Sequence, residues 1–246
     1  MNIKNKTILI TGGGSGIGFE IAKLLSAENK VIIVGRNKLR LDKAVANLPN
    51  VIAISADITN EKDINDLVDE INNNHSDLSI LINNAGFGYS YIFSESSDTY
   101  TKALSEFTTN YFAPIRLTEK LLPVLKKQSE AAIVNVTSIV AFTPNETIPT
   151  YSDSKAAFHS YTQVLRHTLS KNTNIKVFDL MPPLVDTELT AEIGGKEHGM
   201  PAGDVAKSLI DSLKEDVYEI HVGQTEGFYN GFFASSKAAF ETMNQG

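Results

Sequence analysis

Short β-branched apolar runs alternate along this chain with longer amphipathic stretches, and this alternation limits the possible folds more than any other feature. The apolar runs are continuous, which is typical of strands buried on both faces. We predict strands at 7–11, 31–34, 51–55, 80–82, 132–136 and 176–180. We predict helices at 16–28, 37–47, 60–73, 98–128, 151–171 and 203–214. Each helical stretch is long enough to join two parallel strands, so the sequence predicts repeated βαβ units.

Right-handed βαβ units build an open parallel sheet with helices on both faces. We therefore predict an α/β fold, a doubly wound parallel sheet of the Rossmann type that binds ligands at the carboxyl ends of its strands. No proline-rich linker or repeat interrupts the chain, so we expect one NAD(P)-binding domain over 1–246. The stretch 186–202 contains three glycines and no clear apolar period, and we predict a mobile substrate lid there.

The composition argues against several kinds of partner. The chain has 29 acidic and 22 basic residues, a net charge of -7 and no Lys/Arg-rich run, so we expect neither nucleic acid nor a membrane as partner. It has no cysteine, and its five histidines lack metal-ligand spacing, so we expect no metal. The apolar runs are too short to cross a bilayer and no secretory signal is visible, which favours the cytoplasm.

A glycine-rich turn joins the first predicted strand to the first predicted helix. Its sequence is Thr11-Gly12-Gly13-Gly14-Ser15-Gly16-Ile17-Gly18. Glycine permits positive φ and a close backbone approach, and a helix N-terminus offers unpaired N–H groups to a pyrophosphate. We therefore predict a dinucleotide site, the alternative being a tight turn without a ligand. The residues that we expect at the cofactor are Gly12, Gly14, Ser15, Gly16, Ile17 and Gly18.

Arg36 follows the second predicted strand, where dinucleotide enzymes contact the adenine ribose. A carboxylate at this position would repel the 2′-phosphate of NADP(H), whereas a guanidinium pairs with it. We therefore predict NADP(H) in preference to NAD(H), with the Ser15 hydroxyl at the same phosphate. The alternative is that Arg36 is a solvated residue at the start of the next helix.

Tyr151 and Lys155 are four residues apart on a predicted helix, so they lie on one face of it. A neighbouring ammonium and an oxidised nicotinamide both lower the pKa of a tyrosine, which makes it usable as a general acid/base. The pair alone fits an exposed helical face better than a catalytic site. Ser138, however, follows the predicted strand 132–136 at the sheet edge where ligands bind. No GxSxG motif surrounds this serine, so nothing supports a nucleophilic role.

Taken in order, the motifs resemble those of the classical short-chain dehydrogenase/reductase family over nearly the whole chain. They are TGxxxGxG at 11–18, Asp57, Asn-Asn-Ala-Gly at 83–86, Asn110, Ser138, and YxxxK at Tyr151 and Lys155. Within the family, the segments around 35–37, 182–187 and 219–227 are most similar to the bacterial DltE-like oxidoreductases. The resemblance implies an enzyme that moves a hydride between NADP(H) and a carbonyl or alcohol substrate.

The resemblance also implies residue roles. Ser138 would bind the substrate oxygen and Tyr151 would exchange the proton. Lys155 would bind the nicotinamide ribose while lowering the tyrosine pKa, and Asn110 would hold a water in a proton relay. The further cofactor contacts that it implies are Asp57, Ile58, Asn84, Ala85, Gly86, Tyr151, Lys155, Pro182, Val185 and Thr187. An alternative for Asp57 is that it only caps the following helix.

The chain departs from the family after its sixth predicted strand, where Pro182-Pro183 replaces the usual Pro-Gly. Proline restricts φ, so we expect a slightly different backbone path beside the nicotinamide. Aromatic residues in 87–97 and 139–150 indicate an apolar substrate pocket. The family also packs helices like those predicted at 98–128 and 151–171 across a two-fold axis, which implies a homodimer or homotetramer. We expect the aromatic tail, 228–240, to serve packing or a subunit interface.

Two other functions stay open at this point. A dinucleotide sensor would bind the cofactor without chemistry, although the Asn110, Ser138, Tyr151 and Lys155 set argues against it. An epimerase or dehydratase could use the same residues through a transient keto intermediate, without net oxidation or reduction of the nicotinamide.

Overall fold

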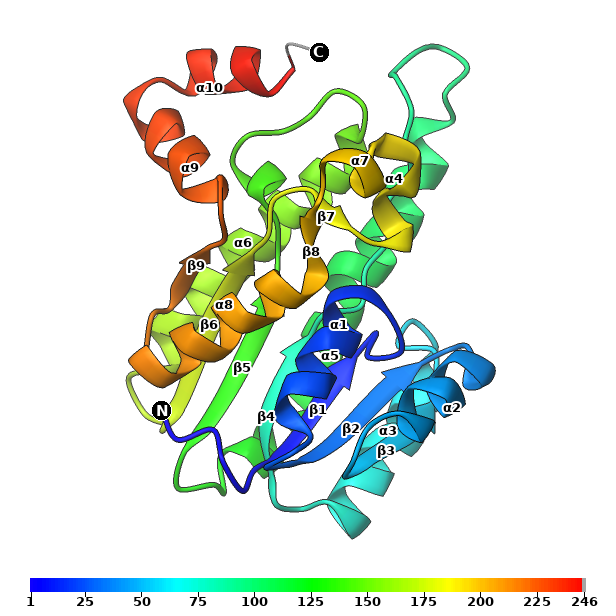
Figure 1. The fold of residues 1–246 in the computed structure, drawn as a ribbon, viewed down its shortest axis with the longest axis vertical. Coiled ribbons are helices and arrows are strands. Elements are labelled where there is room, and N and C mark those ends of the chain that lie inside the picture. The colour runs from blue at the N-terminus through cyan, green and yellow to red at the C-terminus, as the bar shows by residue number, and fades with distance from the viewer. Residues whose placement is uncertain (245–246) are drawn as a thin grey trace.

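A parallel sheet of seven strands forms the centre of the computed structural model, which describes residues 1–244 (Figure 1). Its strand order is β3-β2-β1-β4-β5-β6-β9. The strands are β1 (Thr7–Thr11), β2 (Lys30–Gly35), β3 (Val51–Ser55), β4 (Leu78–Asn83), β5 (Ala131–Val136), β6 (Ile175–Met181) and β9 (Glu219–His221). All six predicted strands are present, which confirms the doubly wound parallel sheet.

Helices cover both faces of the sheet (Figure 1). One layer contains α1 (Gly16–Leu25), α2 (Lys38–Ala46) and α8 (Ala202–Glu215). The other contains α3 (Glu61–Asn74), α5 (Ala113–Leu125) and α6 (Pro149–Leu169). Ile8 and Ile10 of β1 pack with the first layer and Leu9 packs with the second. Because successive side chains point to opposite faces, a continuous apolar run is needed to fill both interfaces.

The seventh strand escaped prediction because it has only three residues, Glu219–His221, of which only Ile220 is an aliphatic residue. It pairs with β6 through the register Leu180↔Ile220, so its strand geometry comes from the neighbouring strand. A second, two-stranded sheet joins β7 (Val185–Asp186) to β8 (Met200–Pro201). It holds together the two ends of the predicted lid, which also contains η3 (Glu188–Ile193) and α7 (Gly195–His198). The mobility of this segment stays a prediction.

The stretch 98–128 is not the single helix that its periodicity predicts. It divides into α4 (Thr99–Phe107), a π-helical turn η1 (Thr108–Phe112) and α5. Pro114 has no N–H, so it cannot donate to the carbonyl of Asn110 four residues earlier, as an α-helix would require. Single π-helical turns of this kind are frequent at functional sites.

Two C-terminal helices, α9 (Thr225–Ala234) and α10 (Ser236–Met243), lie beyond the carboxyl ends of the strands (Figure 1). Tyr229 packs edge-on against Phe142, with 5.3 Å between the ring centroids, and Phe228 and Phe232 belong to the same cluster. Part of the aromatic tail therefore packs within this chain, close to Tyr151. No helix within residues 1–244 is long and apolar enough to cross a membrane.

Candidate active site

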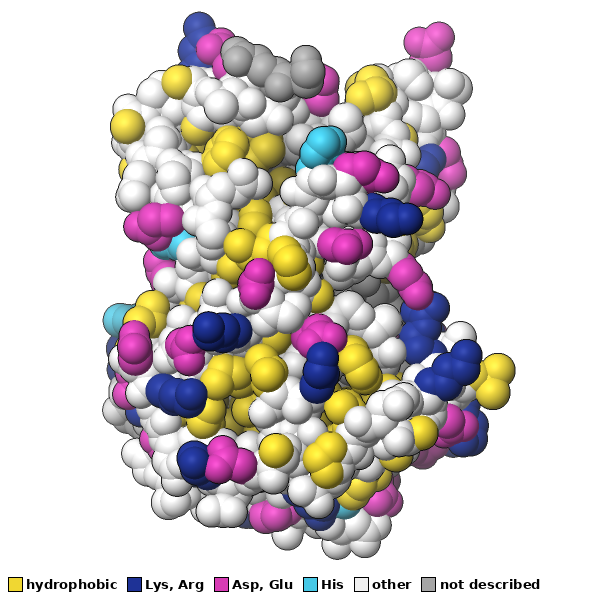
Figure 2. Space-filling model, viewed as in Figure 1, with side chains coloured by type: hydrophobic (Ala, Val, Ile, Leu, Met, Phe, Trp, Pro, Cys, Tyr) yellow, Lys and Arg dark blue, Asp and Glu magenta, His cyan; other side chains and the backbone are white. Residues whose placement is uncertain are grey.

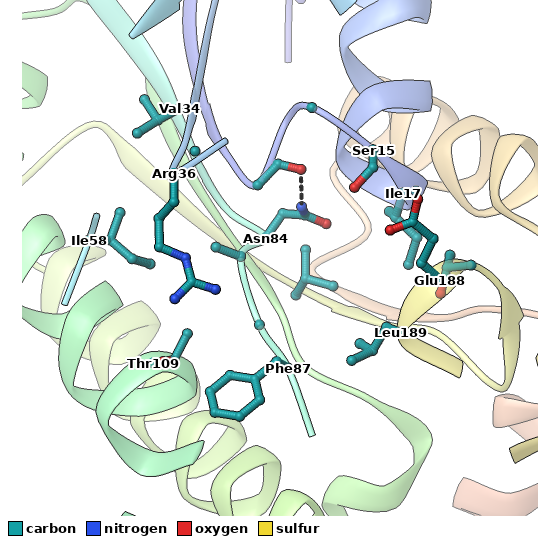
Figure 3. Close-up of a pocket in the computed structure, with 18 of the residues that line it drawn as sticks. Ser15, Ile17, Val34, Arg36, Ile58, Asn84, Phe87, Thr109, Glu188 and Leu189 are labelled. Carbon is teal, nitrogen blue, oxygen red and sulfur yellow. Dashed lines mark hydrogen bonds between the residues drawn. The ribbon is translucent and has the colours of Figure 1, made fainter. Parts of the chain in front are cut away.

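A cleft opens at the carboxyl ends of the central strands, between the glycine turn and the segment that follows β7 (Figure 3). The predicted site residues that line it are Gly12, Gly14, Ser15, Gly16, Ile17, Arg36, Asp57, Ile58, Asn84, Ala85, Gly86, Ser138, Tyr151, Lys155, Pro182, Val185 and Thr187. Gly18 and Asn110 are outside this lining and contact residues that belong to it. The fold thus brings together segments that are far apart in the sequence.

The glycine turn has the conformation that its composition predicts. Gly12 and Gly16 have φ values of 68° and 54°, in the left-handed region that favours glycine. A Cβ atom at Gly18 would lie 2.5 Å from the Gly12 carbonyl oxygen, so Gly18 allows the helix to pack closely against the turn. Ser15 begins α1 without a side-chain capping bond. The first N–H groups of α1 are therefore available to an anionic ligand, which suits the pyrophosphate of a dinucleotide.

Thr11 and Asn84 hold the turn against the end of β4. The Asn84 Nδ2 atom donates to the carbonyls of Thr11 (2.9 Å) and Gly12 (3.3 Å; dashed in Figure 3). The Thr11 hydroxyl accepts from the backbone N–H groups of Asn84 (3.0 Å) and Ala85 (3.1 Å). These bonds fix the backbone of the glycine turn against that of Asn84 and Ala85, which together form the floor of the cleft.

Arg36 points into the cleft beside Ile58, and its guanidinium lies 3.9 Å from the Asp57 carboxylate (Figure 3). The side chain is 73% exposed, so it is free to reorient toward a ligand. Asp57 also accepts from the backbone N–H of Thr59 at 2.9 Å, but the cap of α3 is Asn60, so the alternative that Asp57 caps this helix is wrong. Asp57 therefore stabilises a turn and lines the cleft.

Arg40 is a cleft residue that the sequence analysis missed. Its guanidinium lies 3.5 Å from the Ser15 hydroxyl and forms an ion pair of 2.9 Å with Glu188, across the cleft. The sequence feature that could have identified Arg40 is its place as a second arginine, shortly after Arg36, at the start of the predicted helix 37–47. Figure 2 shows several Lys and Arg side chains close together over α2, which contains Lys38, Arg40 and Lys43. Arg36 and Arg40 both line this end of the cleft, each beside a carboxylate, and guanidinium groups are suited to binding a phosphate.

Tyr151 and Lys155 lie on the face of α6 that borders the cleft. The Lys155 Nζ atom is 5.5 Å from the centroid of the Tyr151 ring and donates to the Val136 carbonyl at 2.8 Å. Burial lowers the pKa of Lys155 to about 8, and the negative charge of Asp179 opposes this effect. Burial raises the pKa of Tyr151, whereas the nearby Ser138 hydroxyl lowers it. Lys155 is the cationic side chain that lines the cleft beside Tyr151.

Asn110 lies in the π-helical turn, behind the cleft. Its side chain pairs with both backbone groups of Phe87, accepting from the N–H at 3.0 Å and donating to the carbonyl at 2.8 Å. It also donates to the Ser154 hydroxyl at 3.0 Å. The side chain thus anchors the loop after β4.

The segment after β6 closes the opposite side of the cleft. The Pro182 carbonyl accepts from the backbone N–H of Ile139 at 2.9 Å, and Pro183 also lines the cleft. Thr187 caps η3 and packs near Gly16, where a Cβ atom would lie 3.2 Å from its methyl group. The Val185 carbonyl accepts a hydrogen bond from Thr190. The glycine turn and the segment 185–190 therefore meet at the cleft.

A family model described as short chain dehydrogenase matches residues 6–198, which include the glycine turn, Ser138, Tyr151 and Lys155. The chain belongs to the short-chain dehydrogenase family. The resemblance stated from its motifs is thereby confirmed. The relatives of this short-chain dehydrogenase include the Bacillus subtilis protein named uncharacterized oxidoreductase DltE. The two are 36% identical over 99% of this chain and 98% of DltE.

Solved structures of short-chain dehydrogenases share the fold. A Burkholderia cenocepacia short chain dehydrogenase in complex with NADP superposes with a TM-score of 0.87, at 25% identity, over 99% of both chains. A Burkholderia phymatum member in complex with NAD has a TM-score of 0.85 at 21% identity, over 100% of this chain and 97% of its own. Relatives of the same fold therefore bind either nicotinamide, and this chain is an oxidoreductase of an NAD(P)-binding family.

The Thr11 hydroxyl gives a direct test of the contact between the turn and β4. Thr11→Val should lower the free energy of unfolding by about 1–3 kcal/mol, because two buried N–H groups lose their acceptor. Cofactor affinity should fall as well, since the floor of the cleft loosens. Thr11→Ser keeps the hydroxyl and should stay within about 1 kcal/mol of wild type. Denaturant unfolding and cofactor titration measure both effects, and equal stabilities of the two variants would contradict the assignment.

Proposed function

We propose that this short-chain dehydrogenase transfers a hydride between NADP(H) and a carbonyl or alcohol substrate, with Tyr151 as general acid/base. The observation that supports it most is the convergence of Tyr151, Ser138 and a buried Lys155 on the cleft that begins at the glycine turn. The wall of the cleft includes the apolar side chains of Phe87 and Leu189. An apolar carbonyl compound is the substrate class that suits this wall.

NADP(H), when bound, supplies or accepts the hydride. In the reductive direction the Ser138 hydroxyl donates a hydrogen bond to the substrate oxygen, and the Tyr151 phenol gives that oxygen its proton. The Lys155 ammonium stabilises the phenolate that remains and holds the nicotinamide ribose. Pro114 has no N–H and leaves the Asn110 carbonyl without its usual helical donor, so this carbonyl can bind a water. That water returns a proton to Tyr151 through Lys155. The oxidative direction reverses each transfer.

The proposed preference for NADP(H) rests on the two arginines that line one end of the cleft, Arg36 and Arg40. Arg36, Arg40 and the Ser15 hydroxyl surround the place where the adenosine half of the cofactor lies in this proposal. Guanidinium groups bind a phosphate through charge-assisted hydrogen bonds. Asp57 and Ile58 line the cleft beside Arg36, which suits the predicted contacts with the adenine.

Activity is tested with a panel of aldehydes, ketones and alcohols, assayed with both nicotinamides by the absorbance of the reduced cofactor. Tyr151→Phe should lower kcat by about 10²- to 10⁴-fold, because it removes only the proton-transferring hydroxyl. NADPH affinity should not change. Tyr161→Phe, which deletes a hydroxyl elsewhere on α6, is the matched control and should stay near wild type. Activity of Tyr151→Phe within a few-fold of wild type would exclude the mechanism. Substrate conversion without net cofactor turnover would instead favour an epimerase or dehydratase.

The cofactor preference has its own test. Arg36→Asp should weaken NADPH binding at least about tenfold relative to NADH, because attraction to the 2′-phosphate becomes repulsion at an exposed site. Arg40→Gln should weaken NADPH binding in the same sense and to a smaller degree. Lys38→Asp makes the same charge change as Arg36→Asp at a position outside the cleft lining, and it should leave the ratio unchanged. Fluorescence titration gives the two dissociation constants. An unaltered ratio in Arg36→Asp would mean that Arg36 does not bind the phosphate.

We also propose a homodimer or homotetramer formed through α4 and α6. These helices and the π-helical turn between α4 and α5 expose Tyr100, Leu104, Phe112 and Val164, all at least half exposed. The double variant Leu104→Glu, Val164→Glu should dissociate the oligomer, whereas Leu39→Glu on α2 should not. Light scattering measures the mass. A single 26.8 kDa particle for the wild type at micromolar concentration would contradict this proposal.

A further inference from the structure

A row of buried polar side chains crosses the sheet one layer below the active site. Asn83 on β4 is in register with Asn135 on β5, which is in register with Asp179 on β6. Asn83 donates to Asn135 at 2.9 Å, and Asn135 donates to Thr162 of α6 at 2.9 Å. Parallel strands covered by helices on both faces are usually apolar at such positions. Asp179, with no exposed surface, is the only ionisable member among these three residues.

The Asp179 carboxylate has two specific partners. One oxygen accepts from the Thr137 hydroxyl at 2.5 Å. The other lies 2.7 Å from Nδ1 of His159, which α6 places four residues after Lys155. A buried carboxylate is costly unless it is paired and hydrogen-bonded, and an apolar side chain would fill the same space at lower cost. The retained charge therefore points to a role other than packing.

Thr137 connects this carboxylate to the catalytic centre through the backbone. It lies between Val136, whose carbonyl accepts from Lys155 at 2.8 Å, and Ser138. The Thr137 N–H donates to the Leu180 carbonyl at 2.8 Å, so both its backbone and its side chain are tied to β6. The bond to Asp179 thus fixes Thr137, which connects Val136, the hydrogen-bond acceptor of Lys155, to Ser138, the predicted substrate-binding residue.

The same carboxylate also acts on Lys155 by its charge. Lys155 is only 4% exposed and donates to a neutral carbonyl, so its ammonium needs a nearby negative charge. Asp179 raises the pKa of Lys155 against the effect of burial. His159 faces the carboxylate from α6, and Arg166 and Glu219, paired at 2.9 Å, lie on its far side. Burial lowers the pKa of His159, but Asp179 and Glu219 together raise it above its usual value, so protonated His159 cancels part of the carboxylate charge at low pH.

We propose that Asp179 is a positioning residue of the catalytic centre, which fixes the Val136–Ser138 strand end through Thr137 and supplies the counter-charge that keeps Lys155 an ammonium. This role rests on the proposed function, because it acts through Lys155 and Ser138. Asp179 itself does not line the cleft, so in this proposal it acts only through its neighbours.

Asp179→Asn tests the counter-charge. The amide keeps the volume of the side chain and can still accept from Thr137, while its NH2 group can donate to Nδ1 of His159 only when that nitrogen carries no proton. The variant therefore removes the carboxylate charge together with the stabilisation of a protonated His159, so its effect on Lys155 is read at alkaline pH, where His159 is neutral. Without that charge Lys155 loses its proton at lower pH. NADPH affinity, and kcat where a substrate is known, should fall as the pH rises and Lys155 loses its proton. In Asp179→Asn the pH of this alkaline fall should be lower by about one unit or more. Fluorescence titration of NADPH between pH 6 and 9 measures this without turnover.

Glu219→Gln is the matched control for lost charge. Glu219 is in register with Asp179 on β9 and pairs with Arg166, so its replacement removes a carboxylate from the same row, farther from Lys155. The alkaline fall in NADPH affinity should stay at its wild-type pH. An unshifted pH dependence in Asp179→Asn, or an equal shift in both variants, would overturn the counter-charge role.

Thr137→Val tests the positioning role and leaves the carboxylate in place. It should lower kcat about tenfold, the effect of losing one charge-assisted hydrogen bond, at every pH and without moving the alkaline fall. A kcat within twofold of wild type would overturn this role. If Asp179→Asn fails to fold, as judged by circular dichroism and melting, Thr137→Val still decides the positioning role. Failure of the wild type to bind NADPH would instead contradict the proposed function, so the two failures are distinguishable.

Discussion

The close packing of the glycine turn against the end of β4 is the contact on which the rest of the site depends. Gly12 and Gly18 approach the Asn84 side chain so closely that a Cβ atom at either would lie within 3 Å of its amide nitrogen. Thr11 then binds the backbone of Asn84 and Ala85. Because the turn is held at this depth, the start of α1 faces a cleft rather than the side of the sheet.

The loop after β4 links that cleft to the catalytic side. Asn110 pairs with both backbone groups of Phe87, and a Cβ atom at Gly88 would lie 2.8 Å from the Tyr151 ring. The loop therefore lies between the helix break at 108–112 and the tyrosine. The irregular turn that Pro114 helps to create is thus part of the support of the active site, and it explains why a regular helix over 98–128 would not serve.

The charged side chains at the two ends of the cleft differ in how deeply they are buried. At the end proposed for the adenosine, Arg36 is largely solvated, and Arg40 is half-exposed and paired with Glu188, so both guanidinium groups can be reached from solution. At the catalytic end, Lys155 is buried and its pKa is lowered to about 8, close to the neutral range. A buried ammonium of this kind is sensitive to every nearby charge, because little water screens it. For this reason a carboxylate one layer below, such as Asp179, matters to it.

Six strands, the glycine turn and the family could be predicted from the sequence. They depend on local properties: side-chain periodicity, positive φ at glycine, and motif spacing. Which distant residues meet could be learned only from the packing of the folded chain. β9 is a strand because β6 pairs with it, and Arg40 enters the cleft because α2 lies beside Ser15. Thr137 and Asp179, 42 residues apart, become partners because β5 and β6 are neighbours in the sheet. Such contacts follow from how elements pack, which no local pattern encodes.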